Sequence, residues 1–287
     1  MLRPLYLLIL AMFALGASAQ TNQQFYPATG VVIKANPTNK TVTIKHETVP
    51  GYMDAMTMAF DVKDTNELTG LEPGDVVTFR IVDEKTEGWI DQIKKTGATT
   101  NTPPTTGPFR AVRDVQPLNE GDALPEYHLT NQLSQAISTA QYKGQALAIT
   151  FLFTRCPYPN FCPLMANNFS QTARKLLVNS SAPTNWHLLT ITFDPEHDTP
   201  EILRAYAEAH HADPAHSTFA TGSLMDITAL GEQFGLAFWK EQGSIINHNL
   251  RTIVIDPQGR VQKVFTGNTW QPEDLVAEIL KATKGRN

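Results

Sequence analysis

Short apolar runs and amphipathic stretches alternate along the carboxy-terminal half of this chain. The run 146–153, Ala-Leu-Ala-Ile-Thr-Phe-Leu-Phe, is apolar and partly β-branched or aromatic, which is typical of a strand buried on both faces. Apolar residues then recur at helical spacing after Pro163. We expect strands near 127–129, 146–153, 186–193, 251–255 and 261–265, and helices over 163–178, 200–210, 224–234 and 272–284. This alternation predicts an α/β sheet with parallel strands.

The amino-terminal part of the chain has a different pattern, with alternating or β-branched segments and no helical period. These segments cover 30–34, 41–46, 56–60, 75–82 and 88–94. Turn-forming dipeptides that contain proline separate them, at 36–37, 50–51 and 73–74. Five short strands in about 70 residues predict a small all-β barrel, closed or partly open.

We expect two domains behind an export signal. Residues 1–19 combine Arg3, an apolar stretch and a small-residue end, Ala-Ser-Ala, which predicts a signal peptide cleaved after Ala19, with an uncleaved membrane anchor as the alternative. Residues 96–116 lack an apolar period and are typical of a flexible linker. The barrel would then span 26–95 and the α/β domain 117–287. Export predicts a periplasmic location, and a formal net charge of -5 argues against a nucleic-acid partner.

The chain has two cysteines, Cys156 and Cys162, between the apolar run and the helix that follows it. Because Pro163 is favoured as the first helical residue, we expect Cys162 at the helix N-cap. The positive end of the helix dipole would favour a thiolate there, and the thiolate is the form that binds metal or attacks a disulfide. Two thiols at a strand-to-helix junction of an α/β sheet point to a thioredoxin-like domain.

A structural disulfide is the alternative for the cysteine pair, because exported proteins meet an oxidising compartment. Closing a ring of about 7 residues removes roughly 2.4 kcal/mol of unfolded-state entropy, against about 4.7 for a 100-residue loop. Such a link would stabilise a domain with a large core only weakly. The placement of the pair therefore favours a redox or metal-binding role.

Three methionines, Met53, Met56 and Met58, gather in one short stretch of the predicted barrel. Met56 and Met58 are two residues apart on a strand and so point to the same face, where His46 from the preceding strand could oppose them. Thioethers are soft ligands that suit Cu(I). The pattern equally fits methionines that fill the barrel core and a histidine at the surface, so both interpretations stay open on the residues alone.

A resemblance bears on this choice. The stretch from His46 through Pro50-Gly51-Tyr52-Met53 to Met56-Thr57-Met58, followed by Phe60 and Trp89, resembles the CusF-like periplasmic copper-binding domain over residues 26–95. That resemblance implies a five-stranded OB-type barrel that binds Cu(I) through His46, Met56 and Met58. Members of the family also place a tryptophan over the metal, where this chain has Tyr52-Met53.

The carboxy-terminal part carries several separated motifs in order: the two cysteines, Asp-Pro-Glu-His-Asp-Thr-Pro at 194–200, Thr-Gly-Ser at 221–223, His248 and Asp-Pro-Gln-Gly-Arg at 256–260. Taken by itself, His248 would be an ordinary loop residue. The set resembles the Sco/SenC family, which implies a thioredoxin-like domain that binds copper through Cys156, Cys162 and His248, with Asp194 fixing the loop. The family spacing is Cys-x3-Cys, whereas this chain has Cys-x5-Cys.

Together the two resemblances imply a periplasmic copper chaperone, with copper as its ligand and a cuproprotein as its partner. The expected acceptor is subunit II of cytochrome c oxidase, which carries the dinuclear copper centre. Two alternatives remain: a thiol-disulfide oxidoreductase in which Cys156 and Cys162 reduce the acceptor's cysteines, and periplasmic copper sequestration. An anchored form would also lie close to the membrane.

Overall fold

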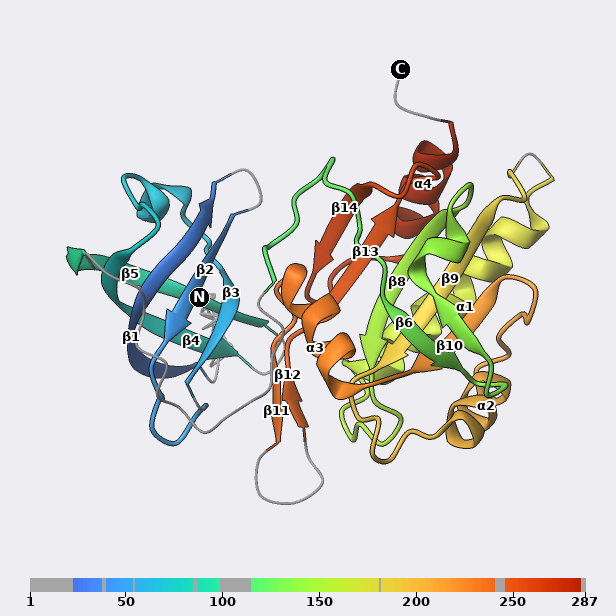
Figure 1. The fold of residues 1–287 in the computed structure, drawn as a ribbon, viewed down its shortest axis with the longest axis horizontal. Helices are drawn as coiled ribbons and strands as arrows, with labels where there is room; N and C mark the ends of the chain where they lie inside the picture. The colour runs from blue at the N-terminus through green and yellow to red at the C-terminus, as the bar shows by residue number, and fades with distance from the viewer. Residues whose placement is uncertain are drawn as a thin grey trace, which may run out of the picture.

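A computed structural model describes residues 23–37, 40–53, 55–84, 87–98, 115–180, 182–240 and 246–284. The predicted signal peptide, 1–19, and most of the predicted linker, 99–114, lie outside the described residues. Among the residues described, no helix is both long and apolar enough to cross a bilayer. The chain folds into a β-barrel and an α/β domain that lie side by side (Figure 1).

The barrel is built from the five segments predicted to be strands. They are β1 (Gln24–Asn36), β2 (Thr41–His46), β3 (Met56–Asp61), β4 (Asp75–Glu84) and β5 (Glu87–Ala98), with a short 3-10 helix η1 (Thr65–Leu68) between β3 and β4. The strands pair antiparallel in the order β3-β2-β1-β4-β5. A parallel bridge between Val62 and Ile90 joins the two edges of this sheet. The apolar face of every strand therefore turns to one shared core.

The α/β domain has a seven-stranded sheet in the order β14-β13-β8-β9-β10-β6-β7. Its strands are β6 (His128–Asn131), β7 (Ala136–Ser138), β8 (Ala146–Leu152), β9 (Trp186–Thr192), β10 (Ser217–Thr221), β13 (Arg251–Ile255) and β14 (Val261–Thr266). Its helices are η2 (Thr139–Tyr142), α1 (Cys162–Val178), α2 (Pro200–Ala209), α3 (Leu224–Gln233) and α4 (Pro272–Thr283). A small hairpin, β11 (Phe238–Lys240) with β12 (Ile246–His248), precedes β13.

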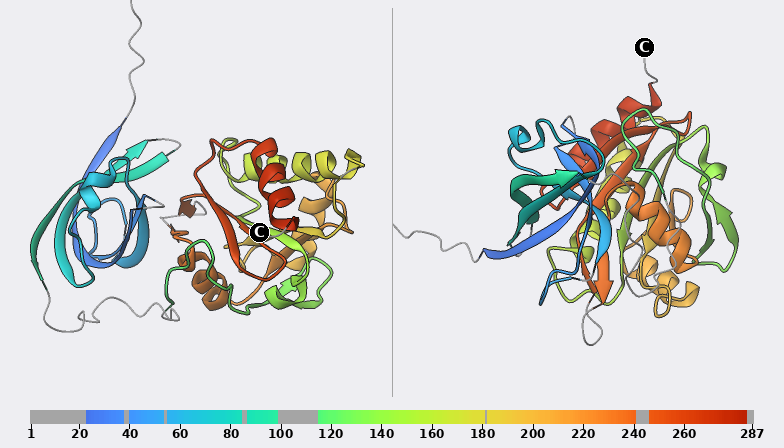
Figure 2. Two further views of the ribbon diagram at one scale, coloured as in Figure 1. Left: turned by 90° about the horizontal axis from the view of Figure 1, so that it is seen from above. Right: turned by 60° about the vertical axis from the view of Figure 1, so that its left-hand side comes forward.

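Both faces of the central strand β8 are buried, as its apolar run predicts. Ala146 and Ala148 pack with α1 and α4 on one face, whereas Leu147, Ile149 and Phe151 pack on the other face with the cluster that includes α3. Small residues under two helices and large residues on the opposite face fill both layers. The two views of Figure 2 show the helices on the two sides of this sheet.

The prediction of a parallel sheet is only partly correct. β8, β9 and β10 run parallel, but β13 runs antiparallel to β8, and β6 runs antiparallel to β10. The reason is that no crossover helix leads directly into β13, because the β11–β12 hairpin lies between α3 and β13. β13 therefore begins at the carboxyl end of β8, where the cysteine loop also begins.

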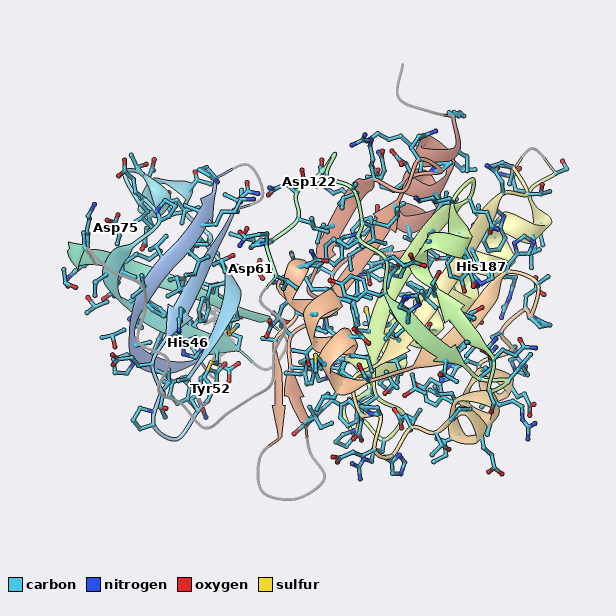
Figure 3. All side chains as sticks on the ribbon, viewed as in Figure 1. His46, Tyr52, Asp61, Asp75, Asp122 and His187 are labelled. Carbon is cyan, nitrogen blue, oxygen red and sulfur yellow. The ribbon has the colours of Figure 1, made fainter. Side chains whose placement is uncertain are left out.

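The two domains contact each other through the start of β13 and the hairpin before it. The buried Arg251 side chain lies 3.3 Å from the carboxylate of Asp61 at the end of β3. Ala237 belongs to the barrel's apolar cluster although it lies in the α/β domain, and Asn36 donates a hydrogen bond to Asn119. Figure 3 shows Asp61 on the side of the barrel that faces the larger domain.

Candidate metal centres

The two cysteines follow the carboxyl end of β8 in a loop that folds back on itself. The Cys156 N–H donates to the Phe153 carbonyl at 3.3 Å, and the Phe161 N–H donates to the Tyr158 carbonyl at 3.0 Å. Both thiols are free and buried. The helix begins at Cys162 with Phe161 as its N-cap, so the prediction of Cys162 at the N-cap is wrong by one residue. Pro163 still occupies the first turn, where its missing N–H costs nothing.

His248 lies with the two thiols, 86 residues beyond Cys162 in sequence. Its Nε2 atom is 3.5 Å from Cys162 Sγ. This nitrogen and the two sulfurs all lie within 4.8 Å of one another. The antiparallel direction of β13 produces this meeting, because His248 ends β12 just before β13 begins at the cysteine edge of the sheet.

Backbone and aromatic contacts fix the His248 ring. Nδ1 lies 2.9 Å from the Asn249 carbonyl oxygen, and since a carbonyl can only accept, Nδ1 carries the hydrogen and Nε2 presents its lone pair. The rings of Phe153, Phe161 and Phe193 surround the imidazole at centroid distances of 5.7, 5.4 and 4.9 Å. The nitrogen is thus held toward the sulfurs in apolar surroundings.

The two thiols have opposite acid-base character. A hydrogen bond from the Cys162 thiol is the main cause that lowers the pKa of Cys156 to about 4, and His248 adds to this effect. Burial, together with the nearby Cys156 sulfur, raises the pKa of Cys162 well above its ordinary value. The expectation that the helix dipole makes Cys162 the thiolate is therefore wrong: complete burial of that side chain outweighs the dipole.

Two buried carboxylates hold the loop that carries Cys156. Asp194 pairs with Arg155, the residue before the cysteine, through Nε at 2.8 Å and the guanidinium amino group at 2.8 Å. The carboxylate of Asp198 accepts hydrogen bonds from the Thr154 N–H at 3.0 Å and from the Thr192 hydroxyl at 2.5 Å. Asp198 was not predicted as a site residue. Asp198 belongs to the 194–200 motif, which the sequence analysis singled out. Sequence spacing does not show which carboxylate of that motif points into the protein.

The donor set at this edge fits copper. Two sulfurs and one imidazole nitrogen are soft to intermediate ligands, and they match the preference of copper for thiolate and imidazole. Donors bound about 2.0–2.3 Å from one ion in a plane would sit roughly 3.5–4 Å apart. Since the three atoms already lie within 4.8 Å of one another, a small closure of the loop would complete such a site.

The barrel holds a second set of candidate ligands around His46 at the end of β2. In the β2–β3 ladder, His46 pairs with Met56, and Ile44 pairs with Met58, so the histidine and both methionines share one face. Met58 and Met53 are buried in the barrel cluster. The Met56 side chain lies outside the described part of the chain, and the structure positions only its backbone. Figure 3 shows His46 and Tyr52 at the same end of the barrel.

The tautomer of His46 is fixed by a backbone carbonyl, as it is for His248. Nδ1 lies 2.7 Å from the Glu47 carbonyl oxygen, so this nitrogen carries the hydrogen. Nε2 is buried and has no hydrogen-bond partner among the residues that the structure describes. Burial also lowers the pKa of His46 below its ordinary value, which favours the neutral imidazole that binds metal. A buried imidazole nitrogen without a partner among the described residues, on a strand that pairs with the one carrying Met58, could serve as a ligand for Cu(I).

Comparison with known families identifies both parts of the chain. The family model described as SCO1/SenC matches residues 115–284, which is more than half of the chain. The chain belongs to the SCO1/SenC family. A second family model, described as copper binding periplasmic protein CusF, matches residues 26–95. The two-domain fold class, an all-β barrel followed by a thioredoxin-like α/β domain, is confirmed. Copper is the metal of this SCO1/SenC protein, as predicted.

Individual relatives agree with this assignment. A SCO2-like protein of Rickettsia prowazekii is 27% identical over 145 residues, which cover 48% of this chain and 67% of the relative. A putative copper-binding protein of Stutzerimonas stutzeri is 28% identical over 146 residues, 49% of this chain and 67% of the relative. The crystal structure of a SCO1/SenC family lipoprotein from Bacillus anthracis has a TM-score of 0.51 at 26% identity and covers 60% of this chain and 99% of that one.

Proposed function

We propose that this SCO1/SenC protein is a periplasmic copper chaperone. The barrel would capture Cu(I) through His46, Met56 and Met58. Cys156, Cys162 and His248 would hold copper in the larger domain and deliver it to a cuproprotein. The observation that carries the proposal is the convergence of two free sulfurs and an oriented imidazole nitrogen within 4.8 Å.

The location and the acceptor are also part of the proposal. The match of residues 26–95 to a family described as periplasmic and the similarity to a lipoprotein both support export. The predicted signal peptide over 1–19 would supply the route. The acceptor that we propose is the dinuclear copper centre in subunit II of cytochrome c oxidase, which follows from the family resemblance of the cysteine domain.

Copper stoichiometry tests the proposal directly. We expect the mature protein to take up two equivalents of Cu(I) in competition with a calibrated chelator. The pair Met56→Ala with Met58→Ala should remove one equivalent, and Cys156→Ser should remove the other. X-ray absorption of each variant should then find sulfur with nitrogen at the remaining site. A protein that takes up no Cu(I) with both sites intact would rule out the chaperone.

A dithiol exchange enzyme is the second candidate, favoured by the lowered pKa of Cys156 beside a second free thiol. A thiolate that attacks a disulfide needs the partner thiol but no third ligand. His248→Ala separates the two functions. The chaperone loses copper retention and oxidase assembly in this variant, whereas the reductase keeps its biological activity and fails only in Cys162→Ser.

A further inference from the structure

A cavity of about 270 Å³ lies between the two domains, next to both candidate copper sites. The barrel lines it with Met53 and Met58, and the larger domain lines it with Phe161 and His248. Met58 and His248 are candidate ligands of different sites. One donor from each site therefore lines the same cavity, which is partly open to solvent.

We propose that this cavity is the passage through which Cu(I) moves directly from the barrel site to the cysteine site while the two domains are docked. The inference rests on the proposed function, since it needs both sites to bind Cu(I). It goes further because it assigns an order, barrel first and cysteines second, and a route that does not pass through bulk solvent.

Ligand exchange gives a balanced step for this transfer. The copper stays Cu(I), so no oxidant or reductant takes part. The bonds from the ion to His46 Nε2 and to the methionine sulfurs break as bonds to His248 Nε2 and the two cysteine sulfurs form. A proton held by the Cys162 thiol is released to water, because thiols bind metal as thiolates. Anionic sulfur attracts a cation more strongly than neutral thioether sulfur, so the transfer runs toward the cysteines.

The residues that dock the two domains also line the cavity. Asp61 and Arg251 both line it and form the ion pair between the domains. The Arg251 guanidinium also donates to the carbonyl oxygens of Phe234 and Leu250 at 2.9 Å each, so its position is set by its own domain. The barrel therefore docks with the Asp61 carboxylate against the Arg251 guanidinium, whose position its own domain already fixes. This ion pair lines the same cavity as Met58 and His248.

The rate at which the cysteine site fills tests the passage in the full-length mature protein. Apoprotein is mixed with one equivalent of Cu(I) as a buffered chelate, and the ultraviolet absorption of copper bound to thiolate is followed in time. We expect the variant His46→Ala with Met58→Ala to load at least tenfold more slowly than the parent, to the same final absorption. Thr269→Trp, at an exposed position of the lining, should slow loading by obstructing the cavity. Asp61→Asn should slow it by weakening docking.

Controls separate this route from general damage and from transfer between molecules. Asp91→Asn removes another Asp–Arg pair of the barrel, with Arg80 at 2.6 Å, and should load at the parent rate. A tethered site has an effective concentration of about millimolar, so a Cys156→Ser, Cys162→Ser protein added at about one micromolar should rescue the barrel variant about a thousandfold less well.

The outcomes distinguish the inference from the proposed function. Parent-like loading of the cysteine site in the barrel variant, or in Asp61→Asn with both sites filled, would overturn the passage and leave the chaperone intact. Full rescue by added protein would overturn it equally. Failure of Cu(I) to bind at either site would instead overturn the proposed function. If Thr269→Trp does not fold, Asp61→Asn decides, because Asp61 is only partly buried and its change removes no core packing.

Discussion

His46 and His248, in different domains, present their imidazoles in one way. Each uses Nδ1 to donate to the carbonyl of the residue that follows it, and each leaves Nε2 for another partner. A backbone carbonyl is a fixed acceptor, so the tautomer is set before any metal arrives. The two sites differ in the ligands that accompany the nitrogen: thiols beside His248, and thioether-bearing residues on the strand face that His46 shares.

We predict that His46 stays neutral at pH values where an ordinary histidine is protonated. Burial lowers its folded-state pKa below 6.5, so the unfolded chain binds more protons as the pH falls through 6.5. The free energy of unfolding of the barrel should therefore decrease on acidification below pH 6.5. Urea unfolding at several pH values, with nuclear magnetic resonance titration of the ring, measures both effects. A ring midpoint at or above 6.5 would contradict the prediction.

The thiol pair predicts a second pH dependence. Since the pKa of Cys156 is lowered to about 4, this thiol is already ionised at pH 6, and its alkylation rate should be nearly constant from pH 6 to 8. An ordinary thiol gains about tenfold in thiolate per pH unit over this range. Mass spectrometry after timed alkylation measures the rate at each cysteine. Cys162→Ala removes the main hydrogen bond that lowers the pKa, so the rate at pH 6 should fall in that variant. A rate that climbs steadily with pH in the parent would refute the assignment.

At the level of elements, the hydrophobic pattern predicts the helices α1, α2, α3 and α4 and the strands β6, β8, β9, β13 and β14 of the α/β domain. It misses β7, β10, β11 and β12, and it does not give the direction of every strand. The buried run at 146–153 and the helix after Pro163 are where the pattern predicts them. Burial on both faces and a proline at a helix start each produce a recognisable local sequence pattern. The antiparallel direction of β13 produces no such local sequence pattern. With a parallel β13, His248 would lie at the opposite edge of the sheet. Sequence spacing alone therefore could not predict that His248 lies beside the cysteines. The prediction of His248 came from the ordered set of motifs that resembles the Sco/SenC family.

Gly30 of β1 supports the barrel site by allowing β2 to approach closely. A Cβ atom at this position would lie 2.6 Å from the Lys45 carbonyl oxygen and 2.8 Å from His46 Cα. We expect Gly30→Ala to lower the free energy of unfolding of the barrel by about 1–3 kcal/mol, as overpacking does. It should also weaken Cu(I) binding at the barrel, since the strand that carries His46 must move. Urea unfolding and chelator competition measure the two effects.

Gly97→Ala in β5 is the matched control for Gly30→Ala. A Cβ atom there meets no heavy atom within 4 Å, so the same change in an exposed strand should leave both stability and copper binding close to those of the parent. Equal losses in the two variants would mean that strand propensity, and not the approach of β2, explains the effect.

The whole molecule is organised around the contact between its two domains. Ala237 directly precedes β11, His248 ends β12 and Arg251 begins β13, so neighbouring positions supply the metal-site histidine and the docking residues. Figure 1 shows β11 and β12 between the barrel and the sheet of the larger domain. The segment that completes the cysteine site is thus also the segment that holds the barrel. Any change in docking therefore acts on the surroundings of His248.

Ala237→Asp tests docking without touching a candidate ligand. Ala237 is buried in the barrel's apolar cluster, and an unpaired carboxylate there would be costly enough to drive the domains apart. Small-angle X-ray scattering should show a pair-distance distribution with a second maximum, while the cysteine site should still bind Cu(I) at equilibrium. Val178→Asp, at an exposed position at the end of α1, should scatter like the parent. If Ala237→Asp scatters like the parent, this contact does not hold the domains together. If it undocks them, loading of the cysteine site should slow as it does in Asp61→Asn, because both variants separate Met58 from His248.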